Sequence, residues 1–443
     1  MAQRILLKNF RIVDANTDKK ASVLVQDGII TDIIDSSKDI SSDLSSITTD
    51  MILDGDALAD GNALLLPAFI DLHAHFRQPA FHIDETPSPL PETLESASLA
   101  AAAGGYGTLV CMANTKPPID TVEAAEILKK RADAIGLIDL YPAVALTKNM
   151  EGYQESEILA LRASAPPREL LLLSEDGKDI PNDTLFIEIM KQAAKLNIPI
   201  ACHCDQLNNE AASVERVLRL AEGTGCKIHI CHVSTKDTID IIRKTKLRAP
   251  APPRELLTAE ATPHHIGATE DDAIRMGIDN YGRVNPPLAT ETDRQAVIAA
   301  LADGTIDAIA TDHAPHSDAA KRNGAPGFVG LETAFAVCNT VLINREPRQP
   351  REQNIGNQFD LRFLSKLMSF NPAKILGLKD RGLISPGLRA DLVIVDPSAV
   401  FTVDSSAFKS RGHCTPFDKR QLRAKILMTL QKGTIVYESA SSN

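Results

Sequence analysis

Two histidines separated by a single residue, His73 and His75, stand at the end of the apolar run Pro67–His73. In a β-strand, residues two apart point to the same side, so both imidazoles can reach one metal ion at the end of that strand. The spacing therefore suits a metal site. Taken alone, it is equally compatible with two unrelated histidines that are satisfied in the core or exposed to solvent.

Further metal-capable side chains lie at the ends of other short apolar runs, at Asp176, His203, His232 and Asp312. If these runs are parallel barrel strands, their C-terminal ends converge on one face, where barrel active sites lie. Four histidines and two aspartates are enough donors for two divalent ions, with imidazole favouring zinc and a carboxylate available to bridge. Neighbouring cysteines (Cys202, Cys204 and Cys231) allow thiolate ligation as an alternative to burial as small apolar side chains.

Such a donor set predicts hydrolytic chemistry. Two divalent ions that share a hydroxide lower the pKa of water toward neutrality, and one of them can polarise a carbonyl oxygen. The leaving nitrogen of an amide then needs a proton. Asp312 is placed to take a proton from the hydroxide and pass it on, acting first as base and then as acid.

The elements that must position these residues are a barrel and a second module. Eight apolar runs alternate with helix-like stretches, which predicts an α/β fold with a (β/α)8 TIM-type barrel over residues 67–376. These runs are Pro67–His73, Thr108–Met112, Asp139–Val144, Leu170–Ser174, Ile198–His203, Lys227–His232, Leu256–Thr262 and Ile306–Thr311. Short β-type runs at both chain ends, residues 1–66 and 377–443, predict a small β-sandwich module built jointly from the two ends.

Composition narrows the class of protein. The chain has 443 residues, of which 44% are apolar and 24% charged, as in ordinary folded proteins. A net charge of -11 without a long basic run argues against a nucleic-acid binder. Seven cysteines without a secretory signal or a membrane-spanning stretch predict reduced thiols and a cytoplasmic protein.

Several longer motifs resemble those of the class I, bacterial-type dihydroorotases of the amidohydrolase superfamily, and the likeness extends over nearly the whole chain. The motifs are Asp71–Arg77, Met112–Pro117, Glu175–Gly177, Cys231–Thr235, Thr262–His265, Asn285–Leu288, Thr311–His316 and Asn371–Ala373. The resemblance implies that His73, His75 and Asp312 hold one zinc ion and that His203 and His232 hold a second. It also implies that Asp176 bridges the two, where many relatives use a carboxylated lysine; Glu175 and Lys178 are less suitable bridges.

The resemblance also implies a substrate-binding set. Arg77, Asn114 and His316 match positions that bind a substrate carboxylate, Asn285 matches a ring contact, and the backbone of Gly327 would meet the substrate. A guanidinium suits this task because it can hold a carboxylate through two parallel hydrogen bonds. Residues 316–332 have the Gly, Ala and Pro content of a mobile active-site loop, with an ordinary surface loop as the alternative. His264 and His265 are expected to be structural.

The implied activity is the reversible hydrolysis of L-dihydroorotate to N-carbamoyl-L-aspartate, a step of pyrimidine biosynthesis, with two zinc ions per subunit. The alternatives are an allantoinase or dihydropyrimidinase, or a non-catalytic scaffold subunit of aspartate carbamoyltransferase. A homodimer is expected, with association to a carbamoyltransferase left open. Three departures from the family pattern affect loop geometry and turnover rather than reaction class: Gln78–Ala80, Met112–Asn114 and a short 317–327 loop.

Overall fold

All eight apolar runs predicted as barrel strands appear as strands in the computed structural model, which describes residues 3–35, 49–81, 90–156, 170–204, 209–248, 256–277, 281–344 and 359–440. Three form the parallel sheet β6(Phe69–Ala74), β7(Tyr106–Cys111) and β8(Asp139–Pro142). Five form the parallel sheet β9(Leu173–Ser174), β10(Ile200–Cys202), β11(Ile228–Ile230), β12(Leu257–Ala261) and β13(Ala308–Ile309). Every residue of β6 and β7 is buried, which explains their continuous apolar sequences: both faces of a parallel sheet are covered.

The two parallel sheets meet at two seams. At one seam Val144, after β8, forms a parallel bridge with Leu173 of β9. At the other, Ala74 of β6 bridges to His313, and the His75 amide donates to the His313 carbonyl over 2.8 Å. The arrangement is therefore TIM-barrel-like, although the continuous ladders stop at each seam and only single bridges cross it.

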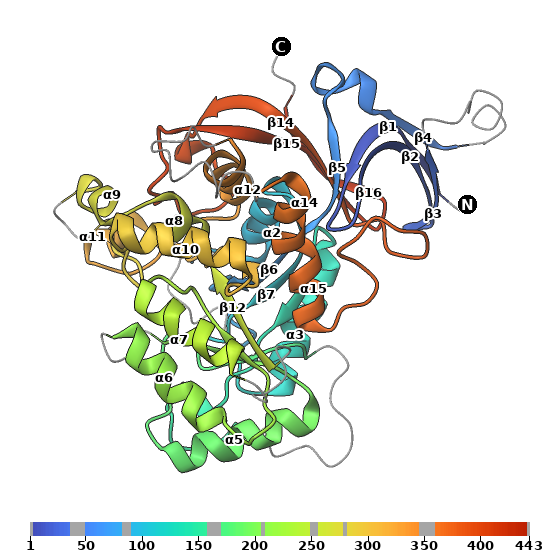
Figure 1. Cartoon of the computed structure of the whole chain (residues 1–443). Coiled ribbons are helices and arrows are strands. Elements are labelled where there is room, and N and C mark those ends of the chain that lie inside the picture. Colours follow the sequence, from blue (N-terminus) through green and yellow to red (C-terminus); the bar gives the residue numbers. More distant parts are fainter. Residues whose placement is uncertain are drawn as a thin grey trace.

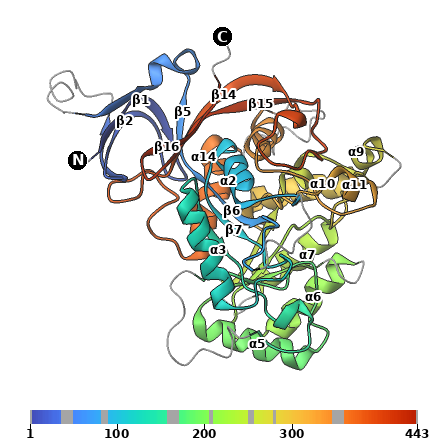
Figure 2. The ribbon, with the colours of Figure 1, turned by 180° about the vertical axis from the view of Figure 1, so that it is seen from behind.

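Helices cover the outer side of these strands (Figures 1 and 2). The longer ones are α2(Leu94–Ala103), α3(Val122–Ile135), α5(Asp183–Leu196), α6(Glu210–Ala221), α7(Lys236–Leu247) and α10(Glu291–Asp303). Most begin at a side-chain cap, for example Thr121 for α3 and Asn182 for α5, which satisfies a free amide of the first turn. The shorter helices are α8(Pro263–Gly267), α9(Glu270–Arg275), α11(Asp318–Arg322), α12(Ala334–Cys338), α14(Leu361–Ser365) and α15(Asn371–Leu376). None of the described helices is both long and apolar enough to cross a lipid bilayer.

The two chain ends share one sheet, as expected. Its strands are β1(Arg4–Val13), β2(Asp18–Gln26), β3(Ile29–Asp35), β4(Met51–Asp54), β5(Leu64–Pro67), β14(Leu392–Thr402), β15(Gln421–Gln431) and β16(Thr434–Glu438). The two ends meet where β5 pairs antiparallel with β14, from Leu64 opposite Val395 to Pro67 opposite Leu392. The described strands form a single curved sheet (Figure 1), so a sandwich of two sheets is not confirmed.

Buried ion pairs fasten this sheet module to the barrel. Asp139, the first residue of β8, accepts a hydrogen bond of 2.8 Å from Arg381 and a second from Arg389. Arg389 also pairs with Asp391 over 2.8 Å. Burial opposes ionisation of Asp139, but the two guanidinium groups hold the pKa of its carboxyl at about 2.

Candidate active site

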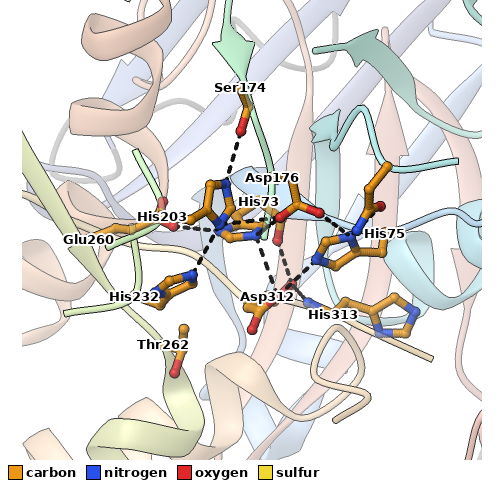
Figure 3. A network of polar contacts seen from close by, with 12 residues as sticks. His73, His75, Ser174, Asp176, His203, His232, Glu260, Thr262, Asp312 and His313 are labelled. Atoms are coloured by element: carbon orange, nitrogen blue, oxygen red, sulfur yellow. Dashed lines mark hydrogen bonds and ion pairs between the residues drawn. The ribbon is translucent and has the colours of Figure 1, made fainter. Parts of the chain in front are cut away.

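Six side chains predicted as metal ligands converge at the C-terminal ends of the barrel strands (Figure 3). His73 belongs to β6 and His75 follows it, and the other four follow β9, β10, β11 and β13: Asp176, His203, His232 and Asp312. All six are buried, with at most 8% of any residue exposed. Their convergence follows from the parallel direction of the strands, because each donor stands where its strand ends.

Asp176 lies between the two groups of histidines. Its Oδ1 is 3.2 Å from His203 Nδ1 and 3.8 Å from His73 Nε2, and its Oδ2 is 3.7 Å from His75 Nδ1. One carboxylate thus faces histidines from both sides of the cluster. Asp176 is the residue for which the family resemblance implies a bridging role, and that role stays a prediction.

Asp312 closes the other side of the cluster. Its Oδ1 lies 3.0 Å from His75 Nε2 and 3.4 Å from His73 Nε2. On the far side of Asp176, His203 Nδ1 and His232 Nε2 are 3.1 Å apart. Two neutral imidazole nitrogens that both present lone pairs repel each other at this separation, unless a proton or a cation lies between them.

Three partners outside the cluster orient its histidines. His73 Nδ1 lies 2.8 Å from Glu260 Oε1, and His75 Nδ1 lies 3.0 Å from Asn114 Oδ1. Both oxygens can only accept, so each ring directs its Nδ1–H outward and its Nε2 inward, where either a proton or a metal ion can sit. His203 Nε2 lies 2.9 Å from Ser174 Oγ, and a proton donated to this hydroxyl leaves Nδ1 bare. Such outward hydrogen bonds are typical of histidines that ligate metals.

The cluster contains buried polar atoms that lack a hydrogen-bond partner, namely His73 Nε2 and Asp176 Oδ2. A buried polar atom without a partner is costly, and both of these atoms face the centre of the cluster. Three of the six donors, His73, His75 and Asp176, have ligand atoms within 4.8 Å of one another. The donor set, its inward lone pairs and its unpaired atoms therefore fit divalent cations.

The charge state of the cluster agrees with a cation site. Burial and nearby histidines lower the pKa of His203 to about 3, so this imidazole is neutral. Although burial opposes ionisation, nearby histidines keep the pKa values of Asp176 and Asp312 below their usual range. His73 is the exception, because Asp312 and Glu260 overcome the effect of burial and raise its pKa to about 10. A cation bound at His73 Nε2 would replace that proton.

Three residues in or beside the cluster have a strained backbone. Arg77, His232 and Asp312 have φ values of 59°, 34° and 45°, in the left-handed region that side chains other than glycine rarely adopt. Each costs on the order of 1–3 kcal/mol and persists only where the surroundings enforce it. Part of that enforcement is visible beside Asp312: buried Asp71 accepts hydrogen bonds from the amide of Thr311 at 2.9 Å and its hydroxyl at 2.5 Å.

Arg77 and His316 meet at the edge of the cluster. Arg77 Nη2 lies 3.3 Å from His316 Nε2, and Arg77 Nε donates to the Pro315 carbonyl over 3.3 Å. Burial, followed by the charge of Arg77, lowers the pKa of His316 to about 3, so His316 is neutral beside the guanidinium. The pair presents one positive charge to the site.

The remaining predicted contacts lie on neighbouring segments. Asn114 uses its Oδ1 on His75, which leaves its amide N–H groups to donate elsewhere. Gly327 is buried with φ of +140°, and its amide donates to the Arg283 carbonyl over 3.0 Å. Asn285, two residues beyond Arg283, is exposed. His265 is buried, with Nε2 3.1 Å from the Pro286 carbonyl, consistent with a structural role.

The sequence interpretation assigned no role to Glu260, Ser174 or Lys321. The sequence does contain a sign that Glu260 matters: it is a carboxylate inside the apolar run Leu256–Thr262, and a buried carboxylate must be paired. The three neighbouring cysteines are buried, and burial raises the pKa of Cys231 well above its usual value, which favours an ordinary core thiol. Cys231 Sγ nevertheless lies within 4.8 Å of donor atoms of His73 and His203.

Comparisons with known proteins agree with this geometry. The model of the amidohydrolase family matches residues 64–436. A dihydroorotase from Clostridium botulinum is 35% identical over 442 residues, covering 98% of this chain and 99% of the relative. A dihydroorotase from Caldanaerobacter subterraneus is 35% identical over 464 residues, covering 98% and 97%. Among solved structures, an L-hydantoinase (dihydropyrimidinase) from Arthrobacter aurescens superposes with a TM-score of 0.77 at 24% identity, covering 100% of this chain and 97% of that one.

Proposed function

The chain belongs to the amidohydrolase family and, within it, to the dihydroorotases, and from this premise we propose that it hydrolyses L-dihydroorotate reversibly to N-carbamoyl-L-aspartate in pyrimidine biosynthesis. The observation that carries the proposal is the single positive charge of Arg77, paired with neutral His316, at the edge of the buried His/Asp cluster. Dihydroorotate has a carboxylate for that charge and a ring amide for the cluster.

The cluster holds two zinc ions in this proposal. His73, His75 and Asp312 would hold one ion, His203 and His232 would hold the other, and Asp176 would be shared by both. When bound, such ions lower the pKa of water and polarise a carbonyl oxygen. Support comes from the inward lone pairs and the unpaired buried atoms His73 Nε2 and Asp176 Oδ2.

Asp312 moves the proton. Its carboxylate is ionised at neutral pH, because nearby histidines hold its pKa well below the usual range despite burial. It can therefore accept a proton from the attacking water and deliver it to the ring nitrogen as the carbon–nitrogen bond breaks. The water oxygen stays on the carbonyl carbon, which becomes a carboxylate in the product.

The residues predicted to contact the substrate orient it in this proposal. Arg77, His316 and the amide N–H groups of Asn114 bind the carboxylate, while Asn285 and the backbone of Gly327 contact the ring. Because Asn114 also accepts from His75, one amide would link substrate binding to the metal-ligand shell. This dual use suits an amide, which both accepts and donates.

The larger assembly is part of the same proposal. The two parallel sheets form one (β/α)8 barrel over residues 67–376, and residues 1–66 and 377–443 build the β module as a sandwich. We further propose a cytoplasmic homodimer that is able to associate with aspartate carbamoyltransferase. A purely scaffolding role is disfavoured because all six donors are buried and converge, which a non-catalytic chain would not need.

A side-by-side assay tests the activity. Purified protein is loaded with zinc, its metal content is measured, and turnover of dihydroorotate, allantoin and dihydrouracil is compared. We expect turnover of dihydroorotate alone, since the other two rings lack the carboxylate that Arg77 would bind. Failure of metal-replete protein to hydrolyse dihydroorotate would defeat the proposal, and turnover of dihydrouracil would favour the dihydropyrimidinase alternative.

The Asp312→Asn variant tests the proton route. It keeps a side chain of the same shape, so the metal content should stay close to that of the unchanged protein while turnover is abolished. Near-normal turnover in this variant would rule out Asp312 as the proton carrier.

A further inference from the structure

One lysine lies fully buried beside the segments assigned to the substrate. Lys321 is in α11, with 0% of the residue exposed. Among the described residues no carboxylate forms an ion pair with it, and burial lowers the pKa of its ammonium. Lysine is almost never fully buried unless its charge is satisfied, so its contacts need a reason.

The ammonium of Lys321 is satisfied entirely by backbone carbonyls and one aromatic ring. Its Nζ donates to the carbonyls of Arg283, Ala325 and Gly327 over 2.7, 2.8 and 2.8 Å. These three bonds use all three N–H groups of the ammonium. The ring of Phe328 lies 5.2 Å away, within the range of a cation–π contact.

Those carbonyls belong to the segments that carry the proposed substrate contacts. Gly327 is itself such a contact, and Arg283 precedes Asn285 by two residues. Between the Ala325 and Gly327 carbonyls lies the Pro326 carbonyl, 2.9 Å from His316 Nε2. One ammonium therefore holds the backbone of residues 283–285 against that of residues 325–327. Lys321 itself lies in the loop that begins at His316, so the contacts fix both segments to this loop.

We propose that Lys321 is a positioning residue that fixes the segments assigned to the substrate, by holding the carbonyls of Arg283, Ala325 and Gly327 on one ammonium. The inference rests on the proposed function for the identity of the ligand. Lys321 does not touch substrate. It sets where the Gly327 backbone, His316 and Asn285 stand.

The test compares Lys321→Met with Arg322→Met. Methionine has nearly the same length as lysine but donates no hydrogen bond, and Arg322 is the exposed neighbour, so its replacement causes the same loss of charge without touching the clamp. Steady-state KM and kcat for dihydroorotate are measured together with metal content and hydrogen exchange of residues 323–329.

In Lys321→Met we expect KM to rise about 10- to 100-fold, the range set by losing charge-assisted hydrogen bonds. We expect kcat to change much less, zinc content to stay at the level of the unchanged protein, and exchange in 323–329 to accelerate. Arg322→Met should match the unchanged protein in all four measurements. Lys321→Arg, which keeps the charge and donors, should recover part of the loss in KM.

Three results would overturn the inference: an unchanged KM in folded Lys321→Met, an equal loss in Arg322→Met, or a loss of zinc that parallels the loss of activity. If Lys321→Met does not fold, Lys321→Gln is tested, since its shorter amide still donates. Global unfolding of both variants would also count against the inference, because Lys321 would then be a general core residue. If the unchanged protein does not hydrolyse dihydroorotate, the proposed function fails, whereas the exchange of 323–329 still reports on the clamp.

Discussion

Replacing Glu260 by glutamine should weaken metal binding although none of the proposed metal ligands is replaced. Glu260 is fully buried, and its carboxylate oxygens accept hydrogen bonds from two imidazoles, from His73 Nδ1 at 2.8 Å and from His229 Nε2 at 2.9 Å. His229 Nδ1 in turn lies 2.8 Å from the Thr258 hydroxyl. In Glu260→Gln the amide oxygen can still accept from His73, but the amide nitrogen faces His229, which must move its own proton to Nδ1.

The size of the effect follows from the hydrogen bond to His73. A bond to a charged acceptor contributes roughly 1.5–3 kcal/mol and a neutral one roughly 0.5–1.5 kcal/mol. The substitution therefore removes about 1–2 kcal/mol of support for the orientation and basicity of His73. That is a loss of roughly five- to thirtyfold in affinity, which overlaps the roughly 10- to 100-fold range typical of groups that orient metal ligands.

The assay is competition for Zn²⁺ between stripped protein and a chromogenic chelator, with circular dichroism to confirm folding. Thr258→Val is the control. It removes the hydroxyl that contacts His229 on the side away from Glu260, and it leaves Glu260 and His73 in place. Its affinity should stay near that of the unchanged protein. Unchanged affinity in Glu260→Gln, or an equal loss in both variants, would refute the reasoning.

Three further predictions concern other parts of the molecule. In Gly327→Ala the new Cβ would lie 2.6 Å from Ala314 Cβ at φ of +140°, so the loop must shift; we expect a raised KM for dihydroorotate, and an unchanged KM would contradict the assigned contact. Ser174→Ala removes the hydroxyl beside His203 Nε2, so zinc affinity in the chelator competition should fall about tenfold, whereas wild-type affinity would remove Ser174 from that role. The pKa of Asp139 is about 2 when folded and about 4 when unfolded, so its ion pairs stabilise the protein above pH 4 and are lost as the pH falls to 2. In urea unfolding, the stability difference between the unchanged protein and Asp139→Asn should therefore shrink by about 2 kcal/mol across that window, and a constant difference would argue against the assignment.

The strands and the metal-capable cluster were predictable because both depend on short-range patterns. A fully buried parallel strand is a mostly apolar run, and the acidic side chains within three residues of its end stand on the face where barrel active sites lie, as Asp176 and Asp312 do. Strand β15 was not predicted. It alternates buried and exposed residues and contains Arg423 and Lys425, so its sequence lacks the apolar continuity of the barrel strands.

The residues that support the site, Glu260 and Lys321, could not be predicted from the sequence, because their roles depend on partners that are distant in the chain and close in space. Glu260 belongs to β12 and His73 to β6, and these strands lie in different sheets. Lys321 lies among Ala, Arg, Asn and Gly, in a stretch that resembles an exposed loop, and only its three carbonyl partners give it a reason to be buried. Asn285 is exposed, and its contact with the substrate stays a prediction, because a motif match does not specify how deeply a side chain is buried.

The hydrogen bonds between Asp71 and Thr311 join residues 240 positions apart, at the first and last strands of the barrel. His73 and Asp312 flank that contact, so the ligands proposed for the first metal come from opposite ends of the barrel sequence. Closing so long a segment costs chain entropy and delays the contact during folding. A nascent chain therefore cannot assemble the proposed ligand set until its last barrel strand has emerged from the ribosome and docked, and under that proposal zinc retention would report that the barrel has finished folding.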